Sequence, residues 1–260
     1  MTPRAAGQLL SGHHRLHLDG KPVNHQSGVS CYAEYAVVDR GSIVVIDKSL
    51  PLDLAALFGC AVVTGVGAVV NTGRIEAGST VAVVGLGGVG LSGLLGAVLA
   101  GASQIVAIDL SDEKLGLARQ LGATHTVNAR DADHVKQVRD LTNGGVDYAF
   151  DLAGTIKSME TAYLVTRWGG TTVSAGLSPI GANFSFAQSG LVSEEKTIKG
   201  SYMGSCVPVR DIPRFIALYQ QGKLPVDRMV SQRIGFGEIN AGFDRLQDVA
   251  TVRQILVPHG

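Results

Sequence analysis

The chain has 260 residues, of which 45% are hydrophobic and 17% charged, a composition typical of one large or two smaller globular domains. Lysine plus arginine and aspartate plus glutamate both number 22, so the formal net charge is zero, and no basic field is present to attract nucleic acid or an anionic membrane surface. The three cysteines, Cys31, Cys60 and Cys206, form no metal-like cluster in the sequence, which favours a reduced, cytoplasmic protein.

The first part of the chain has a β character. Arg15–Leu18, Tyr32–Val38 and Ser42–Ile46 alternate or run apolar and are separated by turn-forming residues, which predicts an antiparallel sheet. These strands are too few to close a barrel or to bury two faces. We therefore expect residues 1–60 to be the end of a β-domain whose beginning is absent.

The middle of the chain alternates helices and strands. Strands are expected at Thr80–Val84, Gln104–Ile108, Thr124–Val127, Val146–Phe150, Gly170–Ala175 and Thr197–Tyr202. Helices are expected at 51–71, Leu91–Ala100, Asp112–Leu121, Ala132–Thr142 and Ile156–Thr166. Repeated βα units with apolar strands predict an α/β fold with a doubly wound parallel sheet of the Rossmann type over residues 61–202.

The remaining residues, 203–260, are expected to form a C-terminal segment that returns to the first domain. Its predicted elements are the helices Pro213–Gln221 and Ile239–Leu246 and the strands Met229–Ile234 and Thr251–Val257.

A glycine-rich turn follows the strand Thr80–Val84. Gly85-Leu86-Gly87-Gly88-Val89-Gly90 has the G-x-G-x-x-G spacing. In this pattern Gly85 permits a tight turn, Gly87 lets the backbone approach a pyrophosphate, and Gly90 allows a helix to pack closely on the strand. The helix N-terminus then offers free N–H groups and a positive dipole end to phosphates. The spacing and its βαβ context predict a dinucleotide site.

An acidic residue completes this fingerprint. Asp109 ends the next predicted strand, 19 residues beyond Gly90, where a carboxylate can accept hydrogen bonds from ribose hydroxyls. The same negative charge would repel a 2′-phosphate, so the sequence predicts NAD rather than NADP.

Segments along nearly the whole chain carry a family resemblance. They are Gly59 to Gly65 (Gly-Cys-x-x-x-Thr-Gly), the fingerprint at 85–90, Ile108-Asp109, Gly122 to Thr124, Thr197 to Gly200, Ile239 to Asp244 and Val252 to Leu256. In this order they resemble zinc-type medium-chain alcohol dehydrogenases, with the closest likeness to the class I/class III branch. The resemblance implies NAD-dependent oxidation of a small-molecule alcohol to an aldehyde or ketone by hydride transfer.

The resemblance also implies roles for individual residues. Cys60 stands at the position of a catalytic zinc ligand, and Thr64 and Val89 stand where side chains pack against the nicotinamide ring. Lys114 would lie near the ribose hydroxyls with Asp109, and Arg253 would reach the pyrophosphate.

Two larger segments have implied roles as well. Residues 1–60 would belong to a GroES-like catalytic domain, and Thr197–Tyr202 would pair two cofactor domains across a homodimer.

This sequence departs from the family pattern at the metal. The family's other zinc ligands, its proton-relay residue and its structural-zinc cysteines would all lie before Gln8, and none is present. A catalytic zinc needs about three protein ligands, so Cys60 alone does not complete the site. His13, His14 and His17 with Cys31 suggest another metal cluster, although alternating histidines in a predicted hairpin are more typical of a solvated strand.

These observations lead to one expectation and two alternatives. We expect the chain to bind NAD and to oxidise alcohols weakly or not at all as it stands. A non-catalytic NAD-binding protein is the first alternative. A zinc-free quinone reductase of the same superfamily is the second, which the cysteine at position 60 and the glycine pattern at 85–90 disfavour.

Overall fold

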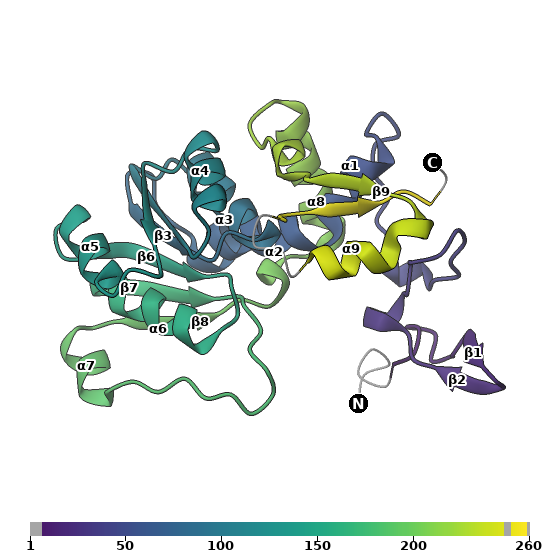
Figure 1. Cartoon of the computed structure of the whole chain (residues 1–260), viewed down its shortest axis with the longest axis horizontal. Helices are drawn as coiled ribbons and strands as arrows, with labels where there is room; N and C mark the ends of the chain where they lie inside the picture. Colours follow the sequence, from purple (N-terminus) through teal and green to yellow (C-terminus); the bar gives the residue numbers. More distant parts are fainter. Residues whose placement is uncertain (1–6, 247–250, 259–260) are drawn as a thin grey trace.

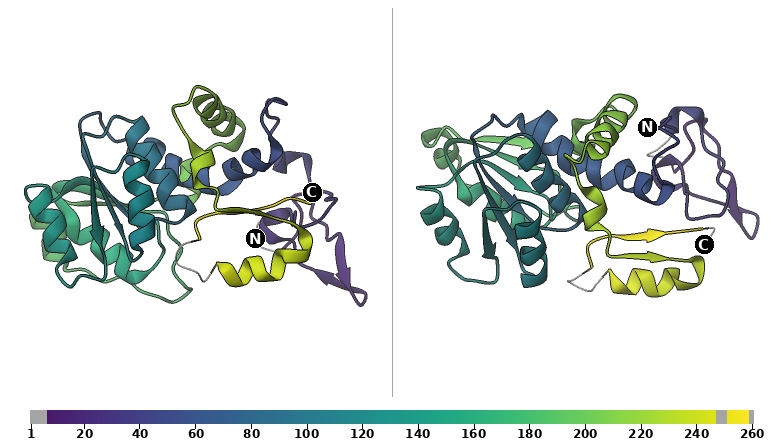
Figure 2. Two further views of the ribbon diagram at one scale, coloured as in Figure 1. Left: turned by 45° about the horizontal axis from the view of Figure 1, so that its top comes forward. Right: turned by 90° about the horizontal axis from the view of Figure 1, so that it is seen from above.

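The computed structural model describes residues 7–246 and 251–258. A parallel sheet lies between two layers of helices, and the N-terminal hairpin and C-terminal elements lie beyond one side of it (Figure 1). The two views in Figure 2 also show the sheet and its helices on one side and the N-terminal hairpin and C-terminal elements on the other.

Six strands form the central sheet. They are β3 (Thr80–Val84), β4 (Gln104–Asp109), β5 (His125–Asn128), β6 (Val146–Asp151), β7 (Thr166–Ser174) and β8 (Thr197–Gly200). Their order in the sheet is β5-β4-β3-β6-β7-β8 and every neighbouring pair is parallel. The chain starts from β3 in the middle, builds outward through β4 and β5, and then crosses to β6 on the other side. This confirms the predicted doubly wound Rossmann sheet.

The strand β3 shows why these segments read as continuous apolar runs. Val81 and Val83 pack into the core cluster that includes α3 and α4, whereas Ala82 and Val84 pack into the opposite cluster with α5 and α6. All four side chains are at most 4% exposed. Because successive side chains point to opposite faces and both faces are covered, all four of these positions are apolar.

The helices of this part are α3 (Gly88–Leu99), α4 (Asp112–Gln120), α5 (His134–Leu141), α6 (Ile156–Val165) and α7 (Gln188–Ser193). Local capping fixes two of their starts. The Ser111 hydroxyl accepts from the Lys114 N–H, and Thr155 and Ser158 form a reciprocal capping box. Helix α3 begins inside the glycine pattern, three residues earlier than the apolar run alone predicts.

The N-terminal part differs from the expectation. Strand β1 (Leu16–Leu18) pairs antiparallel with β2 (Lys21–Val23), and Asp19 and Gly20 form the turn between them. The segments Tyr32–Val38 and Ser42–Ile46 form no strand, so their predicted assignment is wrong. A strand needs a hydrogen-bonded neighbour, and no ladder reaches these segments within the described residues. A short turn intervenes at 40–42, where the Asp39 carboxylate accepts from the Gly41 N–H at 2.8 Å.

A continuous helical stretch runs from Leu52 to Gly73. It consists of α1 (Leu52–Leu57), a π-turn (Phe58–Val62), α2 (Val63–Gly67) and a second π-turn (Ala68–Gly73). Among the described residues it is the one helix long and apolar enough to cross a bilayer by length and composition. Its most apolar window is 61% buried inside the protein, and a core helix passes the same test. It crosses the predicted boundary at residue 60, and the three-part domain division stays a prediction.

The C-terminal elements are α8 (Pro208–Gln220), β9 (Gln232–Ile234), α9 (Ile239–Arg245) and β10 (Gln254–Leu256). Strands β9 and β10 pair in parallel. The predicted helix start at Pro213 is wrong, because Pro208 occupies the first turn and Pro213 lies inside the helix. Asp53 of α1 accepts from Arg233 of β9 at 2.7 Å and ties this part to the long helical stretch.

A buried carboxylate in α8 makes the stability of this fold depend on pH in the acid range. Asp211 is fully buried, and the hydrogen bond from Arg210, helped by the Val207 N–H and by Arg214, lowers its pKa below 3.8 against the opposing effect of burial. The unfolded chain therefore binds this proton at higher pH than the folded one, so stability is present above pH 3.8 and is lost as pH falls through the folded pKa.

We expect the melting temperature of the wild type to fall steeply below about pH 4 and that of Asp211→Asn to be lower near neutrality but less dependent on acid. The measurement is circular dichroism melting between pH 7 and 3. Asp140→Asn is the control, because its ion pair with Lys136 is exposed on both sides and contributes little. Parallel pH curves for the wild type and Asp211→Asn would contradict this account.

Candidate functional site

The glycine turn joins β3 to α3 at the carboxyl edge of the sheet. Gly85 has φ +89°, and a Cβ there would lie 2.5 Å from the Ala153 Cβ. A Cβ on Gly90 would lie 1.7 Å from the Gly85 carbonyl oxygen. A Cβ on Gly87 would have no heavy atom within 4 Å. Gly85 and Gly90 are thus required by the turn and by helix–strand packing, whereas Gly87 faces open space.

Asp109 binds the turn directly. Its carboxylate accepts from the Leu86 N–H at 2.6 Å and from the Ser111 N–H at 2.9 Å. The contact follows from register, because Val84 of β3 lies opposite Ile108 of β4 and the two strands therefore end side by side. The half-buried carboxylate stands at the edge of the turn, where the sequence places the adenosine ribose.

The first turn of α3 carries a local positive field. Its N-cap residue, Gly87, offers no side chain to accept from the N–H groups of the first turn, so these donors are available to an anion. Arg253 adds a full charge, since a Cβ on Gly88 would lie 3.1 Å from the Arg253 Nε and 3.3 Å from its Cζ. The guanidinium therefore lies beside the helix N-terminus, although 165 residues separate the two in sequence. Such a pair of features suits a pyrophosphate.

The long helical stretch supplies the neighbouring wall. Gly65 packs against α3, because its added Cβ would lie 2.2 Å from the Val89 carbonyl oxygen. Thr64 is only 7% exposed, and its hydroxyl donates to the Met203 sulfur at 3.8 Å. Lys114 lies in the first turn of α4, where its N–H is held by the Ser111 hydroxyl. The structure thus groups Thr64 and Val89 at one end of the glycine turn and Asp109 and Lys114 at the other.

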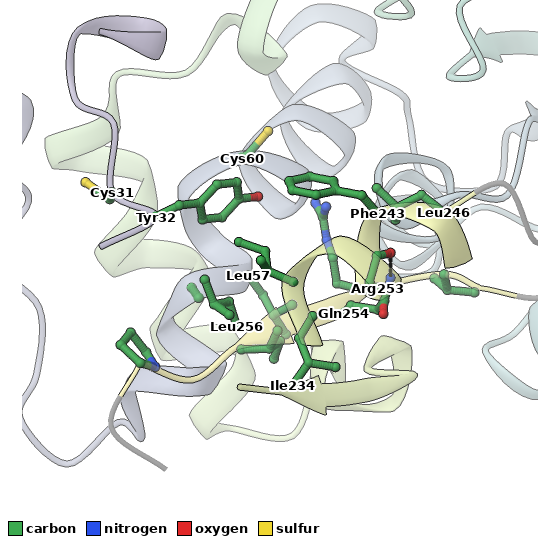
Figure 3. A pocket seen from close by; sticks show the side chains of 16 residues that line it. Cys31, Tyr32, Leu57, Cys60, Ile234, Phe243, Leu246, Arg253, Gln254 and Leu256 are labelled. Carbon is green, nitrogen blue, oxygen red and sulfur yellow. Dashed lines mark hydrogen bonds between the residues drawn. The ribbon is translucent and has the colours of Figure 1, made fainter. Parts of the chain in front are cut away.

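A cleft of about 460 Å³ lies between the helical stretch and the C-terminal elements. Cys60 and Leu57 line one wall, and Arg253 lines the opposite wall together with side chains of α9 and β10 (Figure 3). Tyr32 and Phe243 meet at its mouth with ring centroids 6.0 Å apart in an edge-on arrangement. The cleft is mostly apolar and therefore suits an apolar group beside the cofactor site.

Cys60 is the one residue that the sequence analysis placed at a zinc-ligand position. Within residues 7–246 and 251–258, no group of three or more His, Cys, Asp or Glu side chains is placed to hold a metal ion. Cys60 is exposed on its π-turn, and Cys31 lines the same cleft. Cys206 lies elsewhere, and burial raises the pKa of its thiol to about 11, so it stays protonated and donates to the Val63 carbonyl at 3.3 Å. The described ligand set does not fit a three-ligand catalytic zinc.

The four histidines of the N-terminal hairpin region also form no metal cluster within the described chain. His25 is buried, with one ring nitrogen accepting from the Arg15 N–H at 3.0 Å and the other bonded to the Val29 carbonyl at 3.3 Å. His14 stacks on it with ring centroids 6.3 Å apart. Their contacts hold the hairpin rather than a ligand.

Sequence reasoning missed three residues of this site, Tyr32, Phe243 and Met203. The rings of Tyr32 and Phe243 carry no motif, and their meeting depends on tertiary packing. Met203 contacts Thr64 and has a left-handed backbone, with φ 50°. A methionine in the sequence does not predict this backbone conformation. The sequence offered one indication that Met203 lies near the site, because it closely follows the last strand of the predicted sheet.

Comparisons with known proteins agree with this fold. A family model described as zinc-binding dehydrogenase matches residues 88–221, slightly more than half of the chain. The structure of an alcohol dehydrogenase zinc-binding domain protein from Burkholderia ambifaria is similar, with 34% identity and a TM-score of 0.87 over 92% of this chain and 65% of that one. Benzyl alcohol dehydrogenase from Acinetobacter calcoaceticus has 33% identity and a TM-score of 0.87, over 93% of this chain and 67% of that one.

A third similar structure is a zinc-binding dehydrogenase from Sinorhizobium meliloti 1021 bound to NADP, with 28% identity and a TM-score of 0.73 over 82% of this chain and 61% of that one. The chain thus spans about two thirds of the length of these proteins, and 65% of the first. The match to the family model and the likeness to the solved structures bear out the resemblance carried by the sequence: the chain belongs to the zinc-binding dehydrogenase family.

Proposed function

We propose that the chain binds NAD and provides the cofactor-binding part of an alcohol dehydrogenase that transfers hydride between a small-molecule alcohol and the nicotinamide. The observation that carries the proposal is the hydrogen bond from Leu86 N–H of the fingerprint loop to Asp109, which together with the Ser111 N–H holds this carboxylate at the position that we propose for the ribose. Gly87, the N-terminus of α3 and Arg253 form a cradle that fits a pyrophosphate.

The choice of NAD follows from charge. A 2′-phosphate at the ribose position would lie against the Asp109 carboxylate in a partly buried site, where like charges repel strongly. The Sinorhizobium meliloti protein binds NADP. The acid at this position supports NAD for the present chain.

The chemical part of the proposal stays with residues of this chain. The apolar cleft lined by Cys60 and Leu57 would hold the apolar part of an alcohol and exclude water from the hydride path. Because the described residues supply one candidate metal ligand, we derive no step through zinc. We expect little alcohol oxidation from the chain alone.

That single ligand favours a second candidate function. A non-catalytic nucleotide-binding protein would keep the cradle and Asp109 and would need no metal. The two candidates differ in turnover and not in NAD affinity.

Assembly and location complete the proposal. Strand β8 is an edge of the sheet, so a second copy can pair along it and form a homodimer through Thr197–Tyr202. All three cysteines are free, which supports a reducing, cytoplasmic location.

Calorimetric titration of the purified chain with NAD and NADP tests the proposal, with metal content and benzyl alcohol oxidation measured on the same sample. We expect micromolar NAD affinity, at least tenfold weaker NADP binding, and substoichiometric zinc with negligible turnover. Stoichiometric zinc together with turnover would replace the weak-activity expectation with a complete enzyme. Absence of binding to either dinucleotide would refute the proposal.

A further inference from the structure

The turn that follows β8 has an unusual backbone. Met203, Gly204 and Ser205 all adopt left-handed conformations, with φ values of 50°, 66° and 50°. Residues other than glycine seldom adopt this region, and they do so where the surrounding structure holds them, often at functional sites.

The long helical stretch holds this turn. A Cβ on Gly204 would lie 2.1 Å from the Val63 carbonyl oxygen, so the two backbones touch. Asn71 donates to the Gly204 carbonyl at 3.2 Å. The Thr72 hydroxyl bonds to the hydroxyls of Ser201 and Ser205 at 2.7 and 2.8 Å. The turn is therefore fixed against the helix on both sides of Met203.

Met203 in turn fixes Thr64. The Thr64 hydroxyl donates to the Met203 sulfur at 3.8 Å, which selects one rotamer of a β-branched side chain. The next residue, Gly65, touches the Val89 backbone at the start of α3. Thr64 thus lies between the fingerprint helix and the turn after β8.

The order of the strands in the sheet indicates which half of a bound dinucleotide would lie near Thr64. The sheet switches direction between β3 and β6, and a dinucleotide bound at such a switch point places its two halves on opposite sides of it, outside the carboxyl ends of the strands. Asp109 marks the side of β4, so the nicotinamide half belongs above β6, β7 and β8. Thr64 and the turn after β8 stand on that side.

We propose that Met203 is a positioning residue, which holds the side chain of Thr64 for contact with the nicotinamide half of the dinucleotide. This inference rests on the proposed function. Glycine would adopt the left-handed backbone at this position more easily than methionine. The methionine side chain therefore has a role other than stabilising the turn.

The test compares NADH with ADP-ribose, which lacks the nicotinamide, by calorimetry on the full chain carrying Met203→Gly or Met203→Leu. Glycine removes the side chain and suits the left-handed backbone, so we expect a melting temperature within a few degrees of the wild type. We expect at least fivefold weaker NADH binding, unchanged ADP-ribose binding, and a blue shift or intensity change of bound NADH fluorescence. Leucine keeps bulk without the sulfur acceptor, and we expect an intermediate loss of NADH affinity.

Ser205→Gly is the matched control, since it relieves the same backbone conformation in the same turn and removes a hydrogen bond to Thr72 rather than the contact with Thr64. It should leave both affinities unchanged. Equal weakening of NADH and ADP-ribose by Met203→Gly would assign the residue a structural role and overturn the inference, as would unchanged NADH affinity. A wild type that binds neither ligand would instead refute the proposed function, and one that binds ADP-ribose as tightly as NADH would refute the positioning role alone.

Discussion

Replacing Gly90 by alanine is expected to abolish NAD binding and to destabilise the fold. The new Cβ would lie 1.7 Å from the Gly85 carbonyl oxygen, a backbone atom that cannot move without displacing the turn. Helix α3 would have to move away from β3, whose residues Val81–Val84 are at most 4% exposed. Overpacking typically costs about 1–3 kcal/mol, and we expect a value at the upper end because the atom in the way belongs to the backbone. Urea unfolding and NAD calorimetry measure the two effects.

Two other glycines serve as controls for Gly90→Ala. Gly116 lies in α4 with open space at its Cβ position, so Gly116→Ala should leave binding intact and stabilise the helix by about 0.5–1 kcal/mol. Gly87→Ala should fold normally, because nothing lies within 4 Å of its Cβ, yet bind NAD poorly if the pyrophosphate approaches there. A Gly90→Ala protein with wild-type stability and affinity would show that the turn is not the binding element.

Removing the charge of Asp109 is expected to change cofactor choice. Asp109→Asn keeps an acceptor oxygen but removes the charge from the hydrogen bonds to the ribose, and a total loss of about 1.5–3 kcal/mol would lower NAD affinity roughly 10- to 100-fold. NADP should lose much less, because the repulsion of its 2′-phosphate disappears at the same time. Calorimetry with both cofactors gives the ratio of their affinities, which we expect to move toward NADP.

Asp112→Asn is the matched control for this change. Asp112 stands three residues further on, is exposed, and accepts from the Asn128 side chain at 2.8 Å. It has the same charge at the start of α4, without a hydrogen bond to the fingerprint. A similar shift of the affinity ratio in both variants would mean that the general charge of the loop, and not the Asp109 contact, sets the preference.

The parts of the fold that the sequence predicts well are those where one local pattern has one physical cause. Strand β3 is covered on both faces, so its apolar run Val81–Val84 is continuous, and the bounds of β3 and β6 are both predicted within a residue. Asp109 is predicted from its spacing to Gly90, and the register of β3 and β4 explains why that spacing works. Pattern and geometry coincide at these positions.

The remaining features depend on partners that lie far away in the sequence. The alternation in Tyr32–Val38 shows that these residues would suit a sheet, but it says nothing about whether a neighbouring strand exists. Arg253 approaches Gly88 only because β10 pairs with β9, and no local pattern around residue 253 encodes that approach. The family resemblance supplied this role. Neither source predicted the contact between Thr64 and Met203.

The helical stretch Leu52–Gly73 joins the candidate cofactor site to the cleft as a single rod. Gly65 packs closely against α3 and Gly67 against Gly204, and these two contacts together hold the fulcrum of the stretch, which is the point about which it could tilt. The arm from the fulcrum to Leu52 is roughly 20 Å long at 1.5 Å per residue. A small tilt there would displace Cys60 and the outer end of the arm while Thr64 stays almost still. The cleft wall that carries Cys60 is thus the part of this stretch that a tilt would move, and the Thr64 side is the part that the glycine contacts hold.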